Sequence, residues 1–107
     1  MAKQQNITID QGTDVQFEYL ILNNSNEQID LTDYEARAKM RKHWASANSV
    51  EFSASISGNT VILTLTNEET GELDPGRYVY DVEIISDSDQ VSRVVEGICT
   101  VRPSSTY

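Results

Sequence analysis

The sequence contains a single cysteine, Cys99, so no disulfide can form within the chain. A fold without bridges is typical of a protein made in a reducing compartment, or of one that is stable without them. Runs of aliphatic residues extend over no more than three positions, as in Leu20 to Leu22, and the first five residues lead into polar sequence. We therefore expect no signal peptide, membrane-spanning helix or membrane anchor.

Basic residues are scarce. Lysine and arginine number 8 against 17 aspartates and glutamates, which gives a formal charge of -9 at pH 7. A chain this acidic repels the phosphates of nucleic acids and the headgroups of anionic membranes. We therefore expect neither as a partner, and a basic or neutral protein surface instead.

Motifs that carry chemistry are also missing. The one histidine, His43, has no second histidine or cysteine near it in sequence, so it does not indicate a metal site, and no nucleophile accompanies it. Asp87 and Asp89 resemble the start of a calcium loop but lack the glycine and distal glutamate of an EF-hand, which favours a solvated hairpin turn. No glycine-rich phosphate loop or Gly-x-Ser-x-Gly elbow is present. We predict no enzymatic activity, no cofactor and no metal.

What the sequence does contain is a series of β-strand patterns. Apolar residues at every second position recur between turn signals, at the spacing of a sandwich or barrel. At 107 residues the chain predicts one domain over 1–107, with 103–107 as a flexible tail. The predicted inward positions are Ile7, Ile9, Val15, Phe17, Tyr19, Ile21, Tyr34, Ala36, Ala38, Met40, Val50, Phe52, Ala54, Ile56, Val61, Leu63, Leu65, Tyr78, Tyr80, Val82 and Ile84.

Two connections have distinct signals. Ser57-Gly58-Asn59 suits a tight hairpin between the strand of Val50 to Ile56 and the strand of Val61 to Leu65. Residues 67–73 begin with a capping residue, Asn67, and are acidic early, which predicts a single helical turn.

The last strand, Val91 to Val101, carries apolar residues on both faces. A strand of this kind is expected to be central in its sheet or covered by a neighbour. Gly97 within it is predicted to mark a bulge that changes the register.

Leu73-Asp74-Pro75-Gly76-Arg77-Tyr78 resembles the tyrosine corner of Greek-key sandwiches, in which a connection crosses between sheets. Pro75 presets φ, Gly76 permits a positive φ, Leu73 packs beneath the crossing, and the Tyr78 hydroxyl returns to a backbone group. A plain Pro-Gly hairpin turn is the alternative, and Tyr80 could take the corner position. The pattern predicts an all-β Greek-key β-sandwich of about seven strands with at most one short helical turn.

Four of the eight basic residues fall in one short segment, as Arg37, Lys39, Arg41 and Lys42. We call the first three, which share one strand face, the basic stripe. One interpretation makes it a docking surface for an acidic partner or another copy of the chain. The other is intrachain, because Asp81 and Glu83 could lie beside it as cross-strand ion pairs.

Trp44 follows this strand. It could anchor an interface or stack on a carbohydrate, or it could cap the end of the core, where tryptophan is usually mostly buried. A patch of four acidic residues is a possible complement to the basic stripe of a neighbouring copy; its members are Glu68, Glu69, Glu72 and Asp74.

The order and spacing of several fragments resemble a family of small virion domains of tailed bacteriophages. Such domains occur in tail, neck and baseplate proteins and at the N-terminus of baseplate upper proteins. The resemblance spans nearly the whole chain and rests on the segments 9–12, 30–34 with 40–41, 61–66, 75–83 and 94–101.

The resemblance implies an immunoglobulin-like β-sandwich that acts as a non-enzymatic structural or adaptor protein of the virion, made in the host cytoplasm. Its partners would be other virion proteins or copies of itself, docked in a symmetric assembly. The family offers no catalytic residues to carry over. The alternative is a carbohydrate- or ligand-binding β-sandwich that uses Trp44 and exposed tyrosines as stacking platforms.

Overall fold

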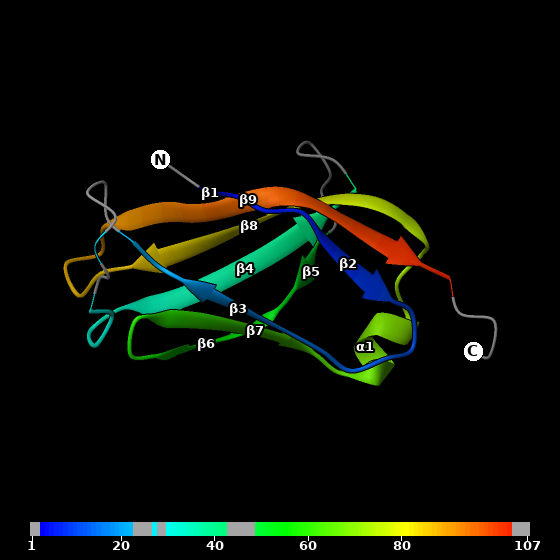
Figure 1. Ribbon diagram of the computed structural model, residues 1–107, viewed down its shortest axis with the longest axis horizontal. Helices are drawn as coiled ribbons and strands as arrows, with labels where there is room; N and C mark the ends of the chain where they lie inside the picture. The colour runs from blue at the N-terminus through cyan, green and yellow to red at the C-terminus, as the bar shows by residue number, and fades with distance from the viewer. Residues whose placement is uncertain (1–2, 23–26, 28–29, 43–48, 104–107) are drawn as a thin grey trace.

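Two β-sheets packed face to face make up the molecule, with one short helix at one end (Figure 1). The computed structural model describes residues 3–22, 27, 30–42 and 49–103. The first sheet has the strand order β1-β9-β8-β4-β5, and β2 also pairs with β9. The second has the order β3-β7-β6.

The strands of the six-stranded sheet are β1 (Lys3–Gln4), β2 (Ile7–Asp10), β4 (Glu35–Arg41), β5 (Val50–Glu51), β8 (Gly76–Ile85) and β9 (Val91–Arg102). Those of the three-stranded sheet are β3 (Val15–Leu20), β6 (Ser53–Ser57) and β7 (Thr60–Leu65), and the helix is α1 (Asn67–Gly71). β1 and β2 run parallel to β9, and the other pairs are antiparallel.

The strand order is immunoglobulin-like. The order β3-β7-β6 corresponds to the B-E-D strands of that fold, and β4-β8-β9 to its C-F-G strands. The first strand departs from the constant-type arrangement, since it lies beside the last strand instead of joining the other sheet. The predicted all-β sandwich is therefore confirmed.

Alternation of apolar and polar residues places the core between the sheets. Along β8 every second residue is buried, and the same holds for β7 and for β2. β9 lies between β8 and the β1–β2 edge, which agrees with its apolar character on both faces. The buried residues are Ile7, Ile9, Tyr19, Ile21, Leu31, Ala38, Met40, Phe52, Val61, Leu63, Leu65, Leu73, Tyr78, Tyr80, Val82, Ile84, Val95, Cys99 and Val101.

The strand predicted from Val50 to Ile56 is divided at Phe52. β5 pairs with β4 in one sheet and β6 pairs with β7 in the other, so the chain changes sheets between them. Phe52 is buried, and its backbone N–H donates to the carbonyl of Ala38 at 3.0 Å. Apolar alternation continues through the crossing, because Val50, Phe52 and Ala54 face the same core from either sheet.

The prediction of a bulge at Gly97 in the last strand is wrong, because the bulge lies at Val94. Val82 pairs with Val95 and Glu83 with Arg93, which leaves Val94 as the extra residue. Gly97 has another role, because a Cβ atom there would lie 2.2 Å from the backbone oxygen of Gln5. Its lack of a side chain lets the chain between β1 and β2 pass against β9.

A chain of hydroxyl groups joins the two sheets at this point. Tyr80 Oη donates to the carbonyl oxygen of Gln5 at 2.5 Å, and Tyr19 Oη lies 3.0 Å from Tyr80 Oη. A carbonyl can only accept, so the Tyr80 proton points to Gln5 and Tyr19 donates to Tyr80. β3 of one sheet is thereby linked through β8 to the β1 edge of the other.

The predicted helical turn is present as α1, but its cap is Thr66 and not Asn67. The Thr66 side chain accepts from the backbone N–H of Glu69, and the Glu69 carboxylate accepts from the N–H of Thr66. This reciprocal pair is a capping box. α1 leads the chain from β7 across the end of the sandwich to β8 (Figure 1).

The segment from Leu73 to Tyr78 forms the crossing. Leu73 is buried, Gly76 has φ of +135°, and Tyr78 Oη donates to the carbonyl oxygen of Asp74 at 2.9 Å. That φ is accessible to glycine and strained for other residues. The hydroxyl satisfies a backbone acceptor at the point where the chain changes sheets, which is the arrangement of a tyrosine corner.

Replacing Tyr78 with phenylalanine should lower the free energy of unfolding by about 1–2 kcal/mol, because the Asp74 carbonyl loses its donor. The ring, and with it the contact to Lys42, is retained in this variant. Urea unfolding monitored by circular dichroism measures the change, with an unaltered denaturant slope as the control for an unchanged fold. A variant as stable as the wild type would show that water replaces the hydroxyl at the corner.

Candidate docking surface

The basic stripe lies on the outer face of the six-stranded sheet and pairs within the chain. Arg37 Nε lies 2.8 Å from Glu83 Oε1, and Lys39 is directly opposite Asp81 in the β4–β8 register. Burial raises the pKa of Asp81, while the positive charges of Arg93 and Arg41 act to lower it. The geometry therefore favours the intrachain interpretation of the stripe over a docking role.

The remainder of this outer face is also a mixture of both signs. Arg93 contacts Asp81 at 3.4 Å and Glu96 at 3.5 Å, and Arg102 contacts Asp10 at 3.6 Å. Exposed pairs of this kind are each worth about 0–1 kcal/mol to stability. Their effect on recognition is larger, because they leave little unbalanced charge to attract an acidic partner.

Lys42 belongs to the corner. Its Nζ lies 4.5 Å from the centroid of the Tyr78 ring and donates to the Pro75 carbonyl at 3.4 Å. This places the cation over the aromatic face, a favourable arrangement. Trp44 and His43 lie outside the described residues, so the interface and carbohydrate interpretations of Trp44 stay predictions.

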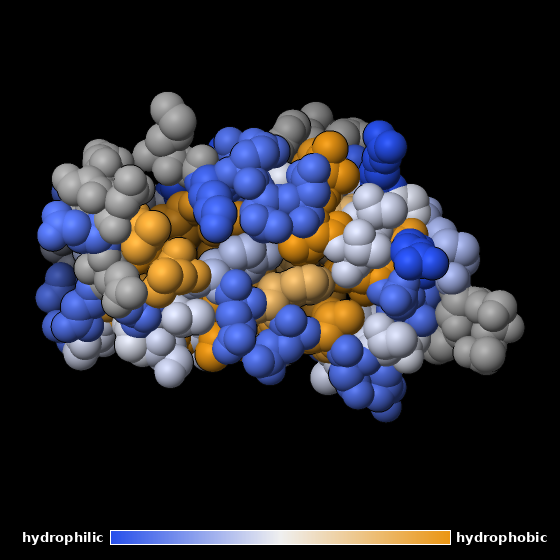
Figure 2. All heavy atoms as spheres, viewed as in Figure 1, coloured by the Kyte–Doolittle hydropathy of each residue, from blue (hydrophilic) through white to orange (hydrophobic). Residues whose placement is uncertain are grey.

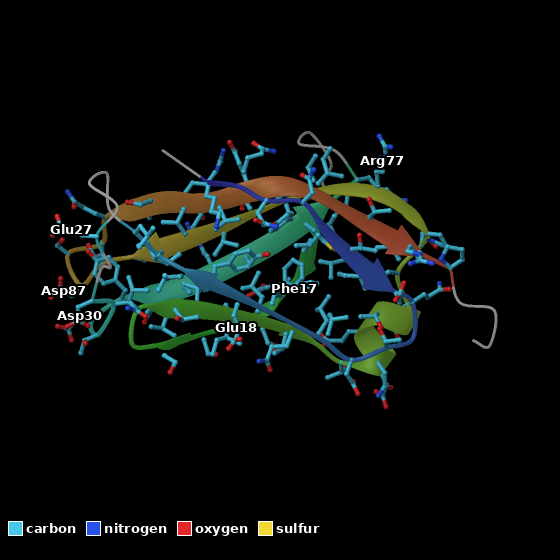
Figure 3. The ribbon with its side chains drawn as sticks, in the orientation of Figure 1. Phe17, Glu18, Glu27, Asp30, Arg77 and Asp87 are labelled. Atoms are coloured by element: carbon cyan, nitrogen blue, oxygen red, sulfur yellow. The ribbon has the colours of Figure 1, made fainter. Side chains whose placement is uncertain are left out.

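The acidic patch is spread over α1 and the corner. Glu69 is used in the capping box and the Asp74 carbonyl in the tyrosine corner. At the opposite end of the molecule Glu27, Asp30 and Asp87 all point outward (Figure 3). No group of three or more potential metal-binding side chains occurs among the residues the structure describes.

The segment around Asp87 is a turn between β8 and β9. The N–H of Asp89 donates to the Ser86 carbonyl at 3.0 Å, and that of Ser86 to the Gln90 carbonyl at 2.9 Å. Asp89 has φ of +63°, a conformation that aspartate tolerates in turns. The hairpin interpretation of this segment is confirmed.

The aromatic residues do not form an exposed platform in the described part of the chain. Tyr19, Tyr78 and Tyr80 are buried, and Tyr34 is half-buried. Phe17 and its neighbour Glu18 on β3 show the division of the two faces, because Phe17 points between the sheets and Glu18 points away (Figure 3). The carbohydrate-binding alternative thus loses most of the tyrosines on which it depends.

The outer face of the three-stranded sheet is nearly free of charge. It is built from short polar side chains with a few aliphatic ones, and Glu18 is the single charged residue among its strand positions. Leu20 at its margin is 46% exposed and Leu22 is 44% exposed. Figure 2 shows hydrophobic residues at the end of the molecule where β3 ends, beside paler residues where the β6–β7 hairpin turns. The outward positions are Gln16, Glu18, Leu20, Ser53, Ser55, Ser57, Thr60, Ile62 and Thr64.

Two of the three strands of this face, β6 and β7, come from a segment without charged residues, a feature that the sequence-based prediction did not use. From Phe52 to Asn67 there are 16 consecutive residues without an aspartate, glutamate, lysine, arginine or histidine. In a chain with 23% charged residues, no other segment is free of charge for so long. The segment forms the β6–β7 hairpin, and a count of charges along the chain would have found it.

The outer edge of β6 is open. Its two-residue loop closes on the pair Ser57–Thr60, so in the alternating ladder Ala54 and Ile56 direct their N–H and C=O groups away from β7. The even-numbered residues on either side of these two also point away from β7. The N–H of Phe52 bonds to the carbonyl of Ala38, and the carbonyl of Gly58 accepts from the N–H of Leu31 at 3.2 Å. None of the described residues pairs with β6 on this side.

A groove of about 650 Å³ runs beside this edge, between β6 and the first half of β4. Its lining includes Leu31, Ala36, Ala54 and Ile56, and Glu35 is the charged residue among those that form it. The groove keeps the edge of β6 accessible from the side. The apolar lining residues are buried or half-buried, whereas Thr32, Glu35 and Ser55 are exposed.

Comparison with models of known protein families and with curated proteins gave no match for this chain. In the described ranges, the single short helix is far below the length needed to cross a membrane. The molecule is thus a sandwich with one charged, internally paired outer face and one nearly uncharged outer face that ends in an open strand edge.

Proposed function

We propose that this chain is a non-enzymatic structural or adaptor module that acts by protein–protein docking in a symmetric assembly. The observation that carries the proposal is the uncharged outer face of the three-stranded sheet on a domain of charge -9. Flat, weakly charged surfaces rich in small side chains dock at little cost in desolvation and side-chain entropy. The resemblance in the order and spacing of sequence segments to small virion domains of tailed bacteriophages supports the same function, in the tail, neck or baseplate.

The partners in this proposal are copies of the chain or neighbouring virion proteins with neutral surfaces. Exposed Leu20 and Leu22 supply apolar contact area at the margin of the face. The charged outer face of the six-stranded sheet would then stay toward solvent, where its ion pairs keep the assembled protein soluble. Arg77, for example, points away from that face (Figure 3).

Self-docking through an uncharged face has a distinctive dependence on salt. Two copies that each carry -9 repel one another, and salt screens this repulsion. We therefore expect the mass measured by light scattering after size exclusion to rise above 12.0 kDa with protein concentration, and more steeply at high salt. Docking through the basic stripe would weaken with salt instead.

Two variants of equal charge locate the surface. Thr64→Glu places a carboxylate on the uncharged face, and Thr100→Glu places one on the opposite outer face, at a threonine that is also half-buried. We expect the first to abolish self-association and the second to leave it unchanged. A wild-type mass of 12.0 kDa at every concentration and salt would contradict self-docking and favour the ligand-binding alternative.

A further inference from the structure

The two sheets have four strand edges in the part of the chain that the structure describes, and these differ in how well they are protected. Natural proteins usually protect such edges with charges, proline, bulges or interruptions. The first edge of the six-stranded sheet is interrupted between β1 and β2 and carries Lys3, and its other edge is partly covered by β5. β3 carries Glu18 at its centre. β6, with the sequence Ser-Ala-Ser-Ile-Ser, has none of these devices.

We infer that β6 pairs with β6 of a second copy of this chain, antiparallel and around a two-fold axis at Ser55. The inference rests on the proposed docking function and names its partner and its contact. It joins two three-stranded sheets into one continuous sheet across the pair.

The pattern of free backbone groups is symmetric about Ser55. Ala54 and Ile56 each present one donor and one acceptor at the open edge, whereas Phe52 and Gly58 already bond to Ala38 and Leu31 of the same chain. In the two-fold register Ala54 faces Ile56 of the second copy, which permits four hydrogen bonds between the chains. Positions 52 and 58 then face each other, where the N–H of Phe52 and the carbonyl of Gly58 are already bonded within each chain.

Charge selects this contact for two identical chains. Pairing β3 with a second β3 on an axis at Glu18 would set Glu18 against Glu18, and like charges directly opposite are destabilising. The end of the molecule with Glu27, Asp30 and Asp87 would repel its own copy in the same way (Figure 3). At β6 the residues that meet are serine with serine and Ala54 with Ile56, so no carboxylate of the strand opposes another.

Cysteine cross-linking tests the register. Ser55 lies at the two-fold axis in a non-hydrogen-bonded pair, where the Cα atoms of opposed residues are about 4.5 Å apart, within the range of a disulfide. Ser53 and Ser57 lie on the same face and are also exposed, but each would lie about 13 Å from its own copy. The native Cys99 is buried, and burial raises its pKa to about 12, so it does not compete for oxidation.

On mild oxidation we expect Ser55→Cys to form disulfide-linked dimers at least about tenfold faster than Ser53→Cys or Ser57→Cys alone, because only the first satisfies disulfide geometry. A mixture of the Ser53→Cys and Ser57→Cys proteins should form heterodimers at a rate near that of Ser55→Cys, since residues 53 and 57 face each other in the register.

Proline at Ala54 removes the pairing without disturbing the hairpin. The N–H of Ala54 points to the open edge, so Ala54→Pro keeps the bonds between β6 and β7. It should slow cross-linking of Ser55→Cys at least about tenfold. If this variant unfolds, Ser55→Glu and Ser55→Gln give a second comparison by light scattering, in which only the glutamate should prevent association.

The outcomes separate this inference from the proposed function. If the wild-type protein self-associates but the three single cysteines cross-link at equal rates, β6 pairing is wrong and docking through another part of the uncharged face stands. If the protein neither associates nor cross-links at any concentration, β6 pairing and self-docking are both wrong, and the proposed function then requires a different protein as the docking partner. Fast cross-linking of Ser55→Cys that Ala54→Pro abolishes would support both.

Discussion

Alanine at position 97 should destabilise the protein by about 3 kcal/mol, although it adds only one methyl group. The added carbon would lie 2.2 Å from the backbone oxygen of Gln5, closer than any van der Waals contact allows. The Cβ atom is fixed to the backbone of residue 97 and the oxygen is part of the backbone of Gln5, so no side-chain rotation relieves the clash. The β1 segment must move away from β9, which breaks the bond between Gln5 N–H and the Glu96 carbonyl and releases the Tyr80 hydroxyl from Gln5.

A truncated chain provides the matched control for this prediction. In a protein that lacks residues 1–5, the oxygen that clashes is absent, so Gly97→Ala should cost less than about 1 kcal/mol there. The coupling between truncation and substitution is measured by urea unfolding of the four proteins. Equal costs in both backgrounds would show that Gly97 serves β9 itself and not the passage of the N-terminal segment.

Alkaline pH should unfold the protein steeply, beginning near pH 9. Burial raises the pKa of Cys99 to about 12 and raises the pKa values of Tyr19, Tyr78 and Tyr80 above their ordinary value of 10.0. In Tyr78 the negative charge of Asp74 adds to this. In the folded protein all four groups are held in the neutral form.

The sign of the effect follows from linkage. A group whose pKa is raised by folding contributes its full stability below the pKa of the unfolded chain and loses it as pH rises toward the folded value. Each group that ionises only in the unfolded chain lowers the free energy of unfolding by about 1.4 kcal/mol per pH unit. The loss therefore begins near pH 9 with Cys99 and becomes several-fold steeper above pH 10, when the tyrosines join it.

Urea midpoints measured between pH 8 and pH 12 test this dependence. Cys99→Ala should remove the loss between pH 9 and pH 10 and leave the steeper part above it. Tyrosinate absorbance should appear together with the loss of β-sheet signal for the buried tyrosines, because they ionise on unfolding. A midpoint that does not change up to pH 11 would contradict the burial of these hydroxyls.

Sequence reasoning predicted the sandwich because its strands face one core and leave the other side to water. Alternation along β8, together with Leu73, Gly76 and Tyr78 at its start, was sufficient to place the change of sheets. The alternation of apolar and polar side chains does not show which strands pair with one another. The crossing at Phe52 keeps the alternation intact, and the parallel pairing of β2 with β9 joins the two ends of the chain, so neither leaves a local signal.

The candidate surface was harder to predict for a different reason. The basic stripe attracted attention because charges cluster there, yet pairing across β4 and β8 depends on register, and only the register shows that Arg37 meets Glu83. The uncharged face is recognised only by the lack of charged residues in its sequence. Ser53, Ser55 and Ser57 look like ordinary solvent-facing positions until the edge beside them is seen to be open.

The parallel pairing of β2 with β9 has a mechanical consequence. The chain enters β2 at Ile7, opposite Cys99, and leaves β9 at Arg102, beside Asp10, so force applied through the two ends of the domain pulls these strands along their length in opposite directions (Figure 1). All four residue pairs then bear the tension together in shear, instead of opening one after another. A module with this geometry resists stretching, which suits a component that transmits force between its neighbours.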